Sequence, residues 1–378
     1  MASSVPVVDL TQDQIMEDQD SASDHEPEKN ASEKPDAHAK PPEDLKAVYK
    51  RYQKITRKSL DEDESIFDPA YGRYAGFSES PAGHSNLQMP DELMEIVKKF
   101  LANHVSVADR IEQIQSSYSC YEHPDLPGLF VFPSLLPEAV QTSLLDRLLH
   151  RDVSNPAHDN NLRLHYNVAY DRDDFLNYRS FFDPKHQTTS FLPHDPSTHK
   201  FLDLPTMLDK KLRWITLGGQ YDWTNKVYPP NRQPPFPADI ASLINGIFPA
   251  IKPQAAILNL YNPGHTLSLH RDVSEECNRP LVSISLGCEG LFLAGLESET
   301  DGPSKFATMR LRSGDVVVMS GAARYAWHAV PKVLPNTCPE WLADWPVIPG
   351  DPATEKYSHY KGWMSGKRIN LNVRQMYD

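Results

Sequence analysis

The sequence predicts an α+β protein, in which helices flank a jelly-roll or sandwich core and a disordered acidic tail precedes both. From residue 254 onward, seven β-rich runs follow one another with turn-forming residues between them, such as Asn262-Pro263-Gly264. Short strands in such a succession are typical of sandwiches and jelly rolls. Residues 1–45 carry 12 acidic and 3 basic side chains, out of 51 and 38 in the 378-residue chain. The remainder is nearly neutral, so a nucleic-acid surface would have to be a local basic patch.

Residues 1–43 form the predicted tail. Between residues 11 and 43 there are almost no aliphatic side chains, so this stretch cannot bury enough apolar surface to offset its backbone entropy. Val7-Val8-Asp9-Leu10-Thr11 has high β propensity and acidic residues follow it. This pattern resembles a SUMO-interacting motif, which adds a strand to the sheet of its partner. An incidental apolar patch is the alternative.

Residues 44–118 are predicted to form a helical extension. Its first helix has apolar residues at helical spacing, including Leu45, Val48 and Tyr52, and residues 90–114 form a second amphipathic stretch. The opposite face of the first helix is basic, and it is either a solvated surface or a contact for nucleic-acid phosphates. The basic residues are Lys46, Lys50, Arg51, Lys54, Arg57 and Lys58.

The main domain is predicted to span residues 119–378 and to begin with a strand and a helix. The four cysteines, Cys120, Cys277, Cys288 and Cys338, include no pair with C-x-x-C spacing, and no secretory signal is evident. We therefore expect reduced thiols in a nuclear or cytoplasmic protein that is not secreted. No mitochondrial presequence is evident, and no apolar run reaches the ~18 residues that span a bilayer. We expect a monomer.

The triplet His270-Arg271-Asp272 matches the catalytic loop of protein kinases, but the surrounding sequence excludes a kinase. A kinase has Asn five residues after this Asp to bind metal, whereas position 277 is Cys. No D-F-G motif follows and no glycine-rich loop precedes it. A G-x-S-x-G nucleophile elbow is also absent from the sequence, so a serine hydrolase is poorly supported.

His270 and Asp272 instead fit a metal site at the end of the predicted strand TLSLH. Residues i and i+2 of a strand project to one side, so the imidazole and the carboxylate can chelate one ion. His328, 58 residues further on, offers a third ligand. Two histidines and one carboxylate on one face are typical of a non-haem Fe(II) centre with open positions for substrates.

Arg368, Asn370 and Arg374 lie on the last predicted strand, and their even spacing directs them to the same face. Two buried guanidinium groups would be unfavourable without anions. A dicarboxylate such as 2-oxoglutarate, with its keto-acid end on iron, would supply them. The alternative is a solvated strand face with two arginines.

The ordered pattern N-x-Y-x-P-G, L-x-L-H-x-D, H, R-x-N-x-x-x-R resembles that of the AlkB family of Fe(II)/2-oxoglutarate dioxygenases. Within this family, PGLFVFP and VPKVLPN are most similar to the eukaryotic AlkB homologue one group. The resemblance implies a double-stranded β-helix form of the jelly roll and the cofactors Fe(II), 2-oxoglutarate and O2. The residues that carry the pattern are Asn259, Tyr261, Pro263, Gly264, Leu267, Leu269, His270, Asp272, His328, Arg368, Asn370 and Arg374.

The resemblance also implies residue roles. His270, Asp272 and His328 would bind Fe(II). Arg368 would pair with the distal carboxylate of 2-oxoglutarate and Arg374 with its keto-acid end. Hydrogen bonds would come from Asn259, Tyr261 and Asn370. Residues 205–240 would form a nucleotide-recognition segment, with Trp214 and Tyr221 lining the base pocket, although Trp214 is alternatively an ordinary core aromatic. An acid that faces the base in the bacterial enzyme is replaced by Ser274, and Glu275 beside it is a candidate substrate contact.

The implied activity is oxidative demethylation of a methylated base in DNA or tRNA, in DNA repair or tRNA modification. N-methyladenine would lose its methyl group as formaldehyde, with succinate and CO2 as co-products, and oxidation of 5-methylcytosine is a variant of this chemistry. The base would have to be unpaired. A protein or small-molecule hydroxylase and a non-catalytic binding protein that uses the tail are the alternatives. The connection at residues 335–362 is either a substrate-facing cover or a packed insert.

Overall fold

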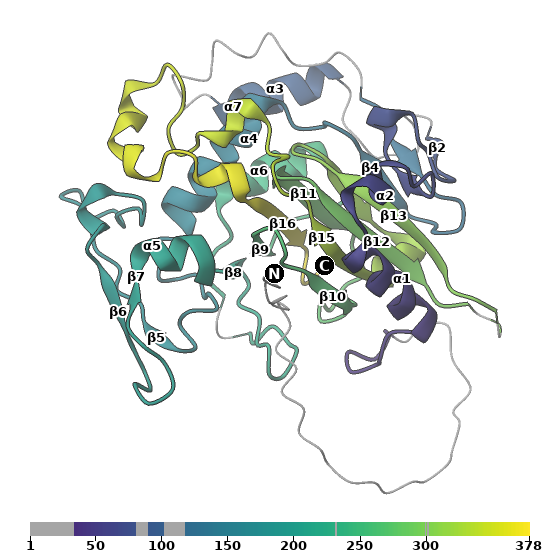
Figure 1. Cartoon of the computed structure of the whole chain (residues 1–378), viewed down its shortest axis with the longest axis horizontal. Helices are drawn as coiled ribbons and strands as arrows, with labels where there is room; N and C mark the ends of the chain where they lie inside the picture. The colour runs from purple at the N-terminus through teal and green to yellow at the C-terminus, as the bar shows by residue number, and fades with distance from the viewer. Residues whose placement is uncertain (1–33, 81–89, 102–117, 231–232, 299, 301) are drawn as a thin grey trace, which may run out of the picture.

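Two β-sheets form the centre of the molecule in a computed structural model that describes residues 34–80, 90–101, 118–230, 233–298, 300 and 302–378 (Figure 1). The larger sheet has eight strands, and each neighbouring pair of strands in it is antiparallel. Across the sheet, its strands are β2 (Ser78–Glu79), β3 (Tyr121–Glu122), β4 (Leu129–Phe132), β14 (Val316–Met319), β11 (Leu281–Gly287), β16 (Arg368–Arg374), β9 (Ala255–Tyr261) and β8 (Trp214–Gly218).

The smaller sheet has five strands, and it carries both histidines of the predicted metal site. Across the sheet, its strands are β1 (Ile66–Phe67), β13 (Lys305–Leu311), β12 (Gly290–Leu296), β15 (Trp327–Val333) and β10 (Leu267–His270). All seven predicted runs from residue 254 onward are confirmed as strands. Strand β15 was not among them, because Pro331 and Lys332 interrupt its apolar pattern.

An apolar layer joins the two sheets. Phe292 of β12 and Met309 of β13 in the smaller sheet belong to the same buried cluster as Val131 of β4 and Val317 of β14 in the larger sheet. The mixed α+β architecture predicted from the sequence is therefore confirmed. The two facing sheets are antiparallel except for the parallel pair β1–β13, which is consistent with a jelly roll.

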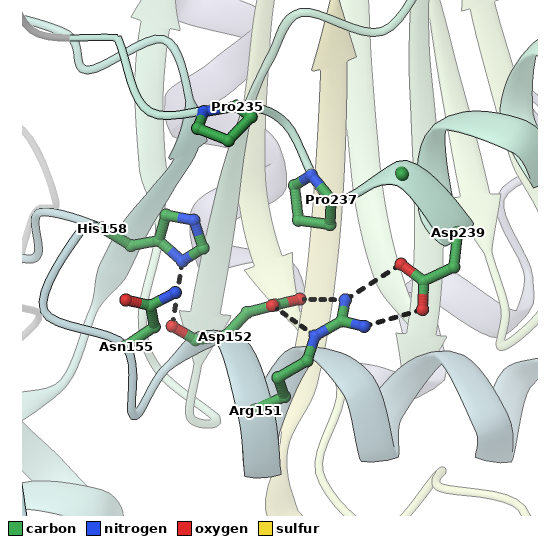
Figure 2. A pocket seen from close by; sticks show the side chains of 8 residues that line it. Arg151, Asp152, Asn155, His158, Pro235, Pro237 and Asp239 are labelled. Carbon is green, nitrogen blue, oxygen red and sulfur yellow. Dashed lines mark hydrogen bonds and ion pairs between the residues drawn. The ribbon is translucent and has the colours of Figure 1, made fainter. Parts of the chain in front are cut away.

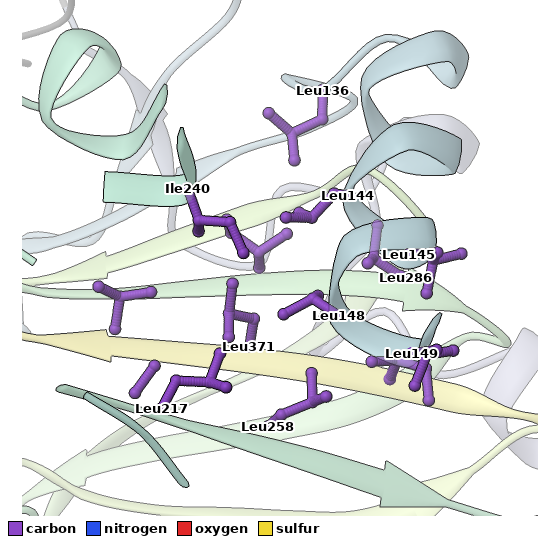
Figure 3. Close-up of a cluster of buried hydrophobic side chains, with 14 of the residues drawn as sticks. Leu136, Leu144, Leu145, Leu148, Leu149, Leu217, Ile240, Leu258, Leu286 and Leu371 are labelled. Carbon is purple, nitrogen blue, oxygen red and sulfur yellow. The ribbon is translucent and has the colours of Figure 1, made fainter. Parts of the chain in front are cut away.

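Helices cover the other face of the larger sheet. Helices α3 (Pro90–Leu101), α4 (Glu138–Leu145) and α6 (Ala238–Ile247) contribute to one cluster with the outward residues of the strands. In Figure 3, Leu148 approaches Leu371 of the sheet, and Leu144 and Leu258 belong to the same cluster. Alternate residues of β16 lie in this cluster, so its remaining residues face the smaller sheet. This alternation directs Arg368, Asn370 and Arg374 to the interior side.

Helix α1 (Glu43–Lys54) confirms the first predicted helix and lies outside the smaller sheet. Leu45 and Tyr52 are buried, and Tyr52 shares a cluster with Leu291 of β12. Part of its basic face is neutralised locally, because Lys46 pairs with Glu43 and Arg51 with Asp63. A phosphate contact of this face stays a prediction.

A smaller three-stranded sheet and several short helices complete the described chain. The sheet consists of β5 (Tyr166–Asn167), β6 (Ser190–Pro193) and β7 (Leu202–Asp203). The short helical segments are α2 (Arg57–Asp61), η1 (Pro69–Tyr71), η4 (Asp146–Asp152), η5 (Pro184–His186), α5 (Leu204–Thr206), η6 (Met207–Lys211), η7 (Gly321–Tyr325), α7 (Glu340–Ala343), η8 (Pro352–Tyr360) and η9 (Trp363–Gly366).

The connection at residues 335–362 is a packed insert. Trp345 is 2% exposed, belongs to the helical-face cluster, and donates a hydrogen bond from its indole to Asp146 at 2.7 Å. Leu342 and Tyr360 are buried in the same cluster. The insert therefore extends the core on the side of the larger sheet that faces away from the smaller one.

The candidate SUMO-interacting motif Val7–Thr11 lies outside the described residues, as does the second part of the amphipathic stretch, residues 102–114. Near the start of the described chain, the carbonyl oxygen of Ala37 accepts a hydrogen bond from Nζ of Lys226 at 3.0 Å. No helix within the described ranges is both long enough and apolar enough to cross a membrane.

Candidate metal centre and anion pocket

His270, Asp272 and His328 converge on one point between the sheets. One ligand atom from each lies within 4.8 Å of the others. His270 and His328 are direct partners on the antiparallel strands β10 and β15. The Nε2 atoms of His270 and His328 lie 3.9 and 3.8 Å from the Asp272 carboxylate oxygens. The structure therefore brings together the three residues that the spacing predicted.

The two imidazoles are oriented for metal binding by the backbone. Nδ1 of His270 lies 2.9 Å from the carbonyl oxygen of Ser268, and Nδ1 of His328 lies 3.0 Å from that of Ala326. A carbonyl oxygen can only accept, so each Nδ1 carries the proton and each Nε2 presents a lone pair. Such second partners fix the tautomer of metal-binding histidines.

The protonation states also suit a divalent cation. Burial would raise the pKa of Asp272, but the charge of Arg374 and the neighbouring imidazoles outweigh it and hold that pKa far below its ordinary value. Burial, assisted by His270, lowers the pKa of His328 to about 4. At neutral pH, Asp272 is ionised and His328 is neutral, which are the forms that bind metal. One carboxylate and two imidazoles fit Fe(II).

The charge of Arg374 is balanced by carboxylates around the metal centre. It donates to the Asp272 carboxylate at 2.6 Å and to the hydroxyl of Tyr228 at 2.8 Å, and its Nε lies 3.3 Å from Glu275. These acids and Tyr228 outweigh the effect of burial and raise the pKa of Arg374 well above its ordinary value. Its predicted contact with the keto-acid end of 2-oxoglutarate stays a prediction, since Asp272 already occupies one of its amino groups.

Glu275 lies inside the protein rather than at an open surface. It is 2% exposed, and its carboxylate pairs with Arg324 at 2.8 Å. Arg324 also donates to the carbonyl oxygen of Asp272 at 2.6 Å and to that of Arg279 at 2.8 Å. The described geometry thus gives Glu275 a supporting position, between Arg324 and Arg374, behind the metal ligand. Both carboxylate oxygens are directed to arginines, and a contact of Glu275 with the substrate stays a prediction.

Arg368 occupies a pocket in which its charge is not balanced. It is 1% exposed and donates to the hydroxyl of Ser285 at 3.0 Å, but within the described chain it forms no ion pair with a carboxylate. Its Nε and the hydroxyl of Tyr261 are both buried without a hydrogen-bond partner. Burial lowers the pKa of Arg368. A carboxylate placed here would satisfy both orphaned groups.

The pocket depends on a glycine of the facing sheet. A Cβ atom at Gly290 would lie 2.7 Å from Nε of Arg368. Gly290 of β12 therefore leaves the space that the guanidinium occupies. The distal carboxylate of 2-oxoglutarate fits this pocket, because the donors are buried, cationic and unpaired.

The two asparagines lie between the anion pocket and the nucleotide-recognition segment. In the sheet register, Asn370 pairs with Asn259, and Asn259 pairs with Trp214. Asn370 donates to the hydroxyl of Ser283 at 2.8 Å. Tyr261 pairs with Arg368 in the next row. The predicted cofactor and substrate residues thus form two adjoining rows on one sheet face.

The predicted nucleotide-recognition segment, residues 205–240, contributes a wall of aromatic rings beside the metal centre. Trp214 lies 4.8 Å from Trp223 between ring centroids, Trp223 lies 4.8 Å from Tyr221, and Tyr221 lies 5.2 Å from Tyr228. Trp214 is half-buried and Trp223 is 42% exposed. Trp214 and Tyr221 therefore lie on one aromatic wall, because each of them contacts Trp223. Trp223 was not among the predicted residues, although it could have been identified from its position two residues after Tyr221.

Figure 2 shows a separate pocket of about 410 Å³ on the helical side of the larger sheet. Its central cation, Arg151, is held between Asp152 at 2.7 Å and Asp239 at 2.7 Å. The charges of this pocket are balanced internally. It carries none of the predicted site residues.

Comparisons with known proteins agree with this site. Residues 177–374 match the family model of the 2OG-Fe(II) oxygenase superfamily. The chain is 40% identical over 370 residues to the N6-methyladenosine RNA demethylase ALKB1 of Pyricularia oryzae, covering 90% of this chain and 97% of that protein.

Two further relatives are also fungal. The chain is 50% identical over 228 residues to the N6-methyladenosine RNA demethylase ALKBH of Cryphonectria parasitica, covering 57% of this chain and 100% of that protein. It is 37% identical over 258 residues to the tRNA demethylase abh1 of Schizosaccharomyces pombe, covering 66% of this chain and 79% of that protein. The chain belongs to the AlkB family of the 2OG-Fe(II) oxygenase superfamily.

Proposed function

We propose that this protein removes the N6-methyl group of adenosine in RNA, with tRNA among its substrates, on a double-stranded β-helix scaffold. The observation that carries this proposal is the metal triad placed between an unpaired anion pocket and an aromatic wall. His270, Asp272 and His328 meet within 4.8 Å, and Trp223 exposes an aromatic face nearby. The relatives named as N6-methyladenosine RNA or tRNA demethylases support the choice of substrate.

When bound, Fe(II) and 2-oxoglutarate supply the oxidation of the methyl group by O2, with succinate and CO2 as the co-products. Arg368 and Tyr261 hold the distal carboxylate of 2-oxoglutarate and so fix its orientation. Arg374 keeps Asp272 ionised and oriented toward the two imidazoles. The hydroxymethyl group on the adenine nitrogen then loses its hydroxyl proton as its carbon–nitrogen bond breaks. Its carbon leaves as formaldehyde, and the nitrogen takes up one proton with the bonding electron pair, which restores the amino group of adenine.

The aromatic wall favours a methylated base as the substrate whose methyl group is oxidised. A methylated base inside a duplex cannot reach an interior site, so it must be unpaired or flipped. Stacking of a base on an exposed aromatic ring stabilises it by about 1–3 kcal/mol and tolerates different bases. Ser274 links this wall to the metal loop, because its hydroxyl donates to the carbonyl of Lys226 at 2.7 Å and lies 3.3 Å from the hydroxyl of Tyr221.

The test is a turnover assay with an N6-methyladenosine oligoribonucleotide, an unmethylated oligoribonucleotide of the same sequence and a peptide mixture. We expect equimolar succinate and formaldehyde with the methylated RNA only, measured by mass spectrometry together with loss of the methylated nucleoside. His270→Ala should abolish both products, and Lys305→Gln, on the exposed part of β13, should leave them unchanged. Succinate formation driven by peptides instead of methylated RNA would favour the hydroxylase alternative.

A further inference from the structure

Three neighbouring strands of the larger sheet end at the same place with polar residues. Arg213 precedes β8, Asn262 follows β9 and Lys367 precedes β16. Because β8, β9 and β16 are adjacent and antiparallel, the start of β8, the end of β9 and the start of β16 lie at one end of the sheet. This is also the end at which Trp214 and Arg368 begin their strands. Residues far apart in sequence are therefore brought together beside both predicted pockets.

The side chains at this sheet end contact one another. Lys367 donates from Nζ to Oδ1 of Asn262 at 2.6 Å, and the backbone N–H of Asn262 donates to Nδ1 of His265 at 2.9 Å. The guanidinium of Arg213 lies against the ring of His265. We call Arg213, His265 and Lys367 the basic cluster. Lys367 also donates to the backbone carbonyl and the carboxylate of Asp209 in η6, so the members of the basic cluster are held in place and are not free surface side chains.

The basic cluster contains more positive than negative charge. Within the described chain, Arg213 forms no ion pair with a carboxylate, and Lys367 has one such partner, Asp209, at 3.1 Å. The side chain of Asp209 is 56% exposed, whereas that of Lys367 is 6% exposed. Two further cations, Lys210 and Lys211, are exposed on the neighbouring segment η6. Arg151 of Figure 2 offers a contrast, since two carboxylates surround it.

The protonation of the basic cluster shows the same imbalance. Burial lowers the pKa of Arg213 to about 10, and burial with the charges of Arg213 and Lys367 lowers the pKa of His265 to about 4. Burial also lowers the pKa of Lys367. At neutral pH the cluster therefore has two partly or fully buried cations around a neutral imidazole. Buried cations of this kind are stabilised when an anion supplies the missing charge and hydrogen bonds.

We propose that the basic cluster binds a backbone phosphate of the nucleic-acid substrate, beside the base that enters the site. Arg213 directly precedes Trp214 of the aromatic wall, so the basic cluster lies at the end of the strand that carries this wall. Strand alternation directs the two side chains to opposite faces, so the basic cluster lies at the rim of the site and is positioned for a phosphate of the substrate chain instead of the base. A nucleic-acid chain that delivers a base to this aromatic wall passes the same end of the sheet. Arg213 supplies a planar fork of donors suited to phosphate oxygens, and Lys367 supplies a point charge. This inference rests on the proposed function and adds a specific contact to it.

The test is the salt dependence of binding to a methylated oligoribonucleotide, measured by fluorescence anisotropy with catalytically inactive protein loaded with Mn(II). Each phosphate contact that is lost should reduce the slope of log K against log salt by about one. We expect Arg213→Gln to weaken binding about tenfold near physiological salt and to flatten the slope by about one. Arg213→Lys should retain most of the slope. Lys305→Gln removes one exposed charge from β13 and should match the parent protein.

Three outcomes would overturn the inference. The first is an unchanged slope in Arg213→Gln protein whose thermal unfolding and stabilisation by 2-oxoglutarate match the parent. The second, if that variant does not fold, is an unchanged slope in Lys367→Gln, which removes the other cation of the basic cluster. The third is displacement by inorganic phosphate alone, with stabilisation of the protein by phosphate but no effect of Arg213→Gln on RNA binding; the cluster would then hold a free anion.

Failure of the proposed function gives a different result. A protein that binds the oligoribonucleotide with the expected Arg213-dependent slope, but whose active form does not demethylate it, would retain the phosphate contact and lose the demethylase assignment. Demethylation by a protein whose RNA binding does not depend on Arg213 would support the demethylase assignment and contradict the phosphate contact. The anisotropy and turnover measurements therefore separate the two claims.

Discussion

Arg368 and Arg374 lie on the same face of strand β16, both buried, yet their surroundings are opposite. The charge of Arg374 is balanced by Asp272 and Glu275, and its guanidinium also donates to Tyr228, although its Nε forms no hydrogen bond. Arg368 has only the Ser285 hydroxyl at 3.0 Å and the Cys288 carbonyl at 3.5 Å, and its Nε has no partner. Accordingly, the pKa of Arg374 is raised well above its ordinary value, whereas burial lowers that of Arg368.

This difference separates two roles for the same residue type. A buried cation whose charge is balanced by carboxylates belongs to the framework, and here it orients a metal ligand. A buried cation without an anion is stable only at a cost, which a ligand can relieve. The contrast between Arg368 and Arg374 therefore supports different roles for them: Arg368 as the residue proposed to bind 2-oxoglutarate, and Arg374 as the residue that orients Asp272. Five substitutions test this distinction.

The largest effect is expected for Asp272→Asn. It removes a metal ligand and leaves Arg374 without its shortest ion pair. Breaking a buried pair costs about 3–5 kcal/mol, and loss of one of three ligands should prevent stable metal binding. Urea unfolding and the metal content after dialysis measure these two effects. A variant that keeps one bound metal ion and the parent stability would show that Asp272 neither binds metal nor pairs with Arg374.

Arg368→Gln should weaken 2-oxoglutarate binding about 100-fold, because a charge-assisted pair contributes about 1.5–3 kcal/mol. Its stability should be unchanged or greater, since the variant loses an unbalanced buried charge. Arg374→Gln is the matched variant and should be destabilised instead, because it leaves Asp272 and Glu275 without their shared cation. Equal losses of stability in the two variants would erase the contrast between the arginines.

Glu275→Gln should weaken metal affinity about tenfold and leave the affinity for 2-oxoglutarate nearly unchanged. Groups that orient metal ligands typically contribute 10–100-fold to affinity, and Glu275 connects Arg324 to Arg374 behind Asp272. Glu276→Gln alters the exposed neighbouring acid and serves as the control. Competition with a fluorescent chelator gives the metal affinity. If the Glu275 variant binds metal normally and loses only RNA affinity, Glu275 contacts substrate as the sequence suggested.

Gly290→Ala tests the anion pocket with the smallest chemical change. Its added methyl group would lie 2.7 Å from Nε of Arg368, so the guanidinium must shift. We expect a rise of several-fold in KM for 2-oxoglutarate with a smaller change in kcat, since misplacement of a binding group mainly affects affinity. Gly366→Ala is a matched control, because an added Cβ there meets no atom within 4 Å. An unchanged KM would place the ligand away from Arg368.

The sequence predicted those parts of the site that depend on strand periodicity and chemical type. His270 with Asp272, and Arg368 with Arg374, lie at even spacing on single strands, so alternation alone directs each pair to one side. His328 could be identified because it joins a known ligand set. These residues are all present in the described site.

Long-range pairing explains what the sequence could not predict. The partner of Glu275 is Arg324, 49 residues away on η7, and no periodicity connects the two. The contact between Arg213 and His265 likewise depends on how β8 and β9 pair. Spacing could not indicate whether residues 335–362 formed a cover or a core insert, because burial of Trp345 depends on its contact with Asp146 of η4. Such contacts are set by tertiary packing.

The most direct test of the difference between the two arginines is a calorimetric titration of 2-oxoglutarate into Mn(II)-loaded Arg368→Gln and Glu275→Gln proteins, side by side with the parent. We predict a Kd about 100-fold higher for Arg368→Gln at full metal occupancy, and a parental Kd for Glu275→Gln once metal is saturating. A parental Kd for Arg368→Gln would contradict the account, because the unpaired guanidinium would then not be the group that receives 2-oxoglutarate.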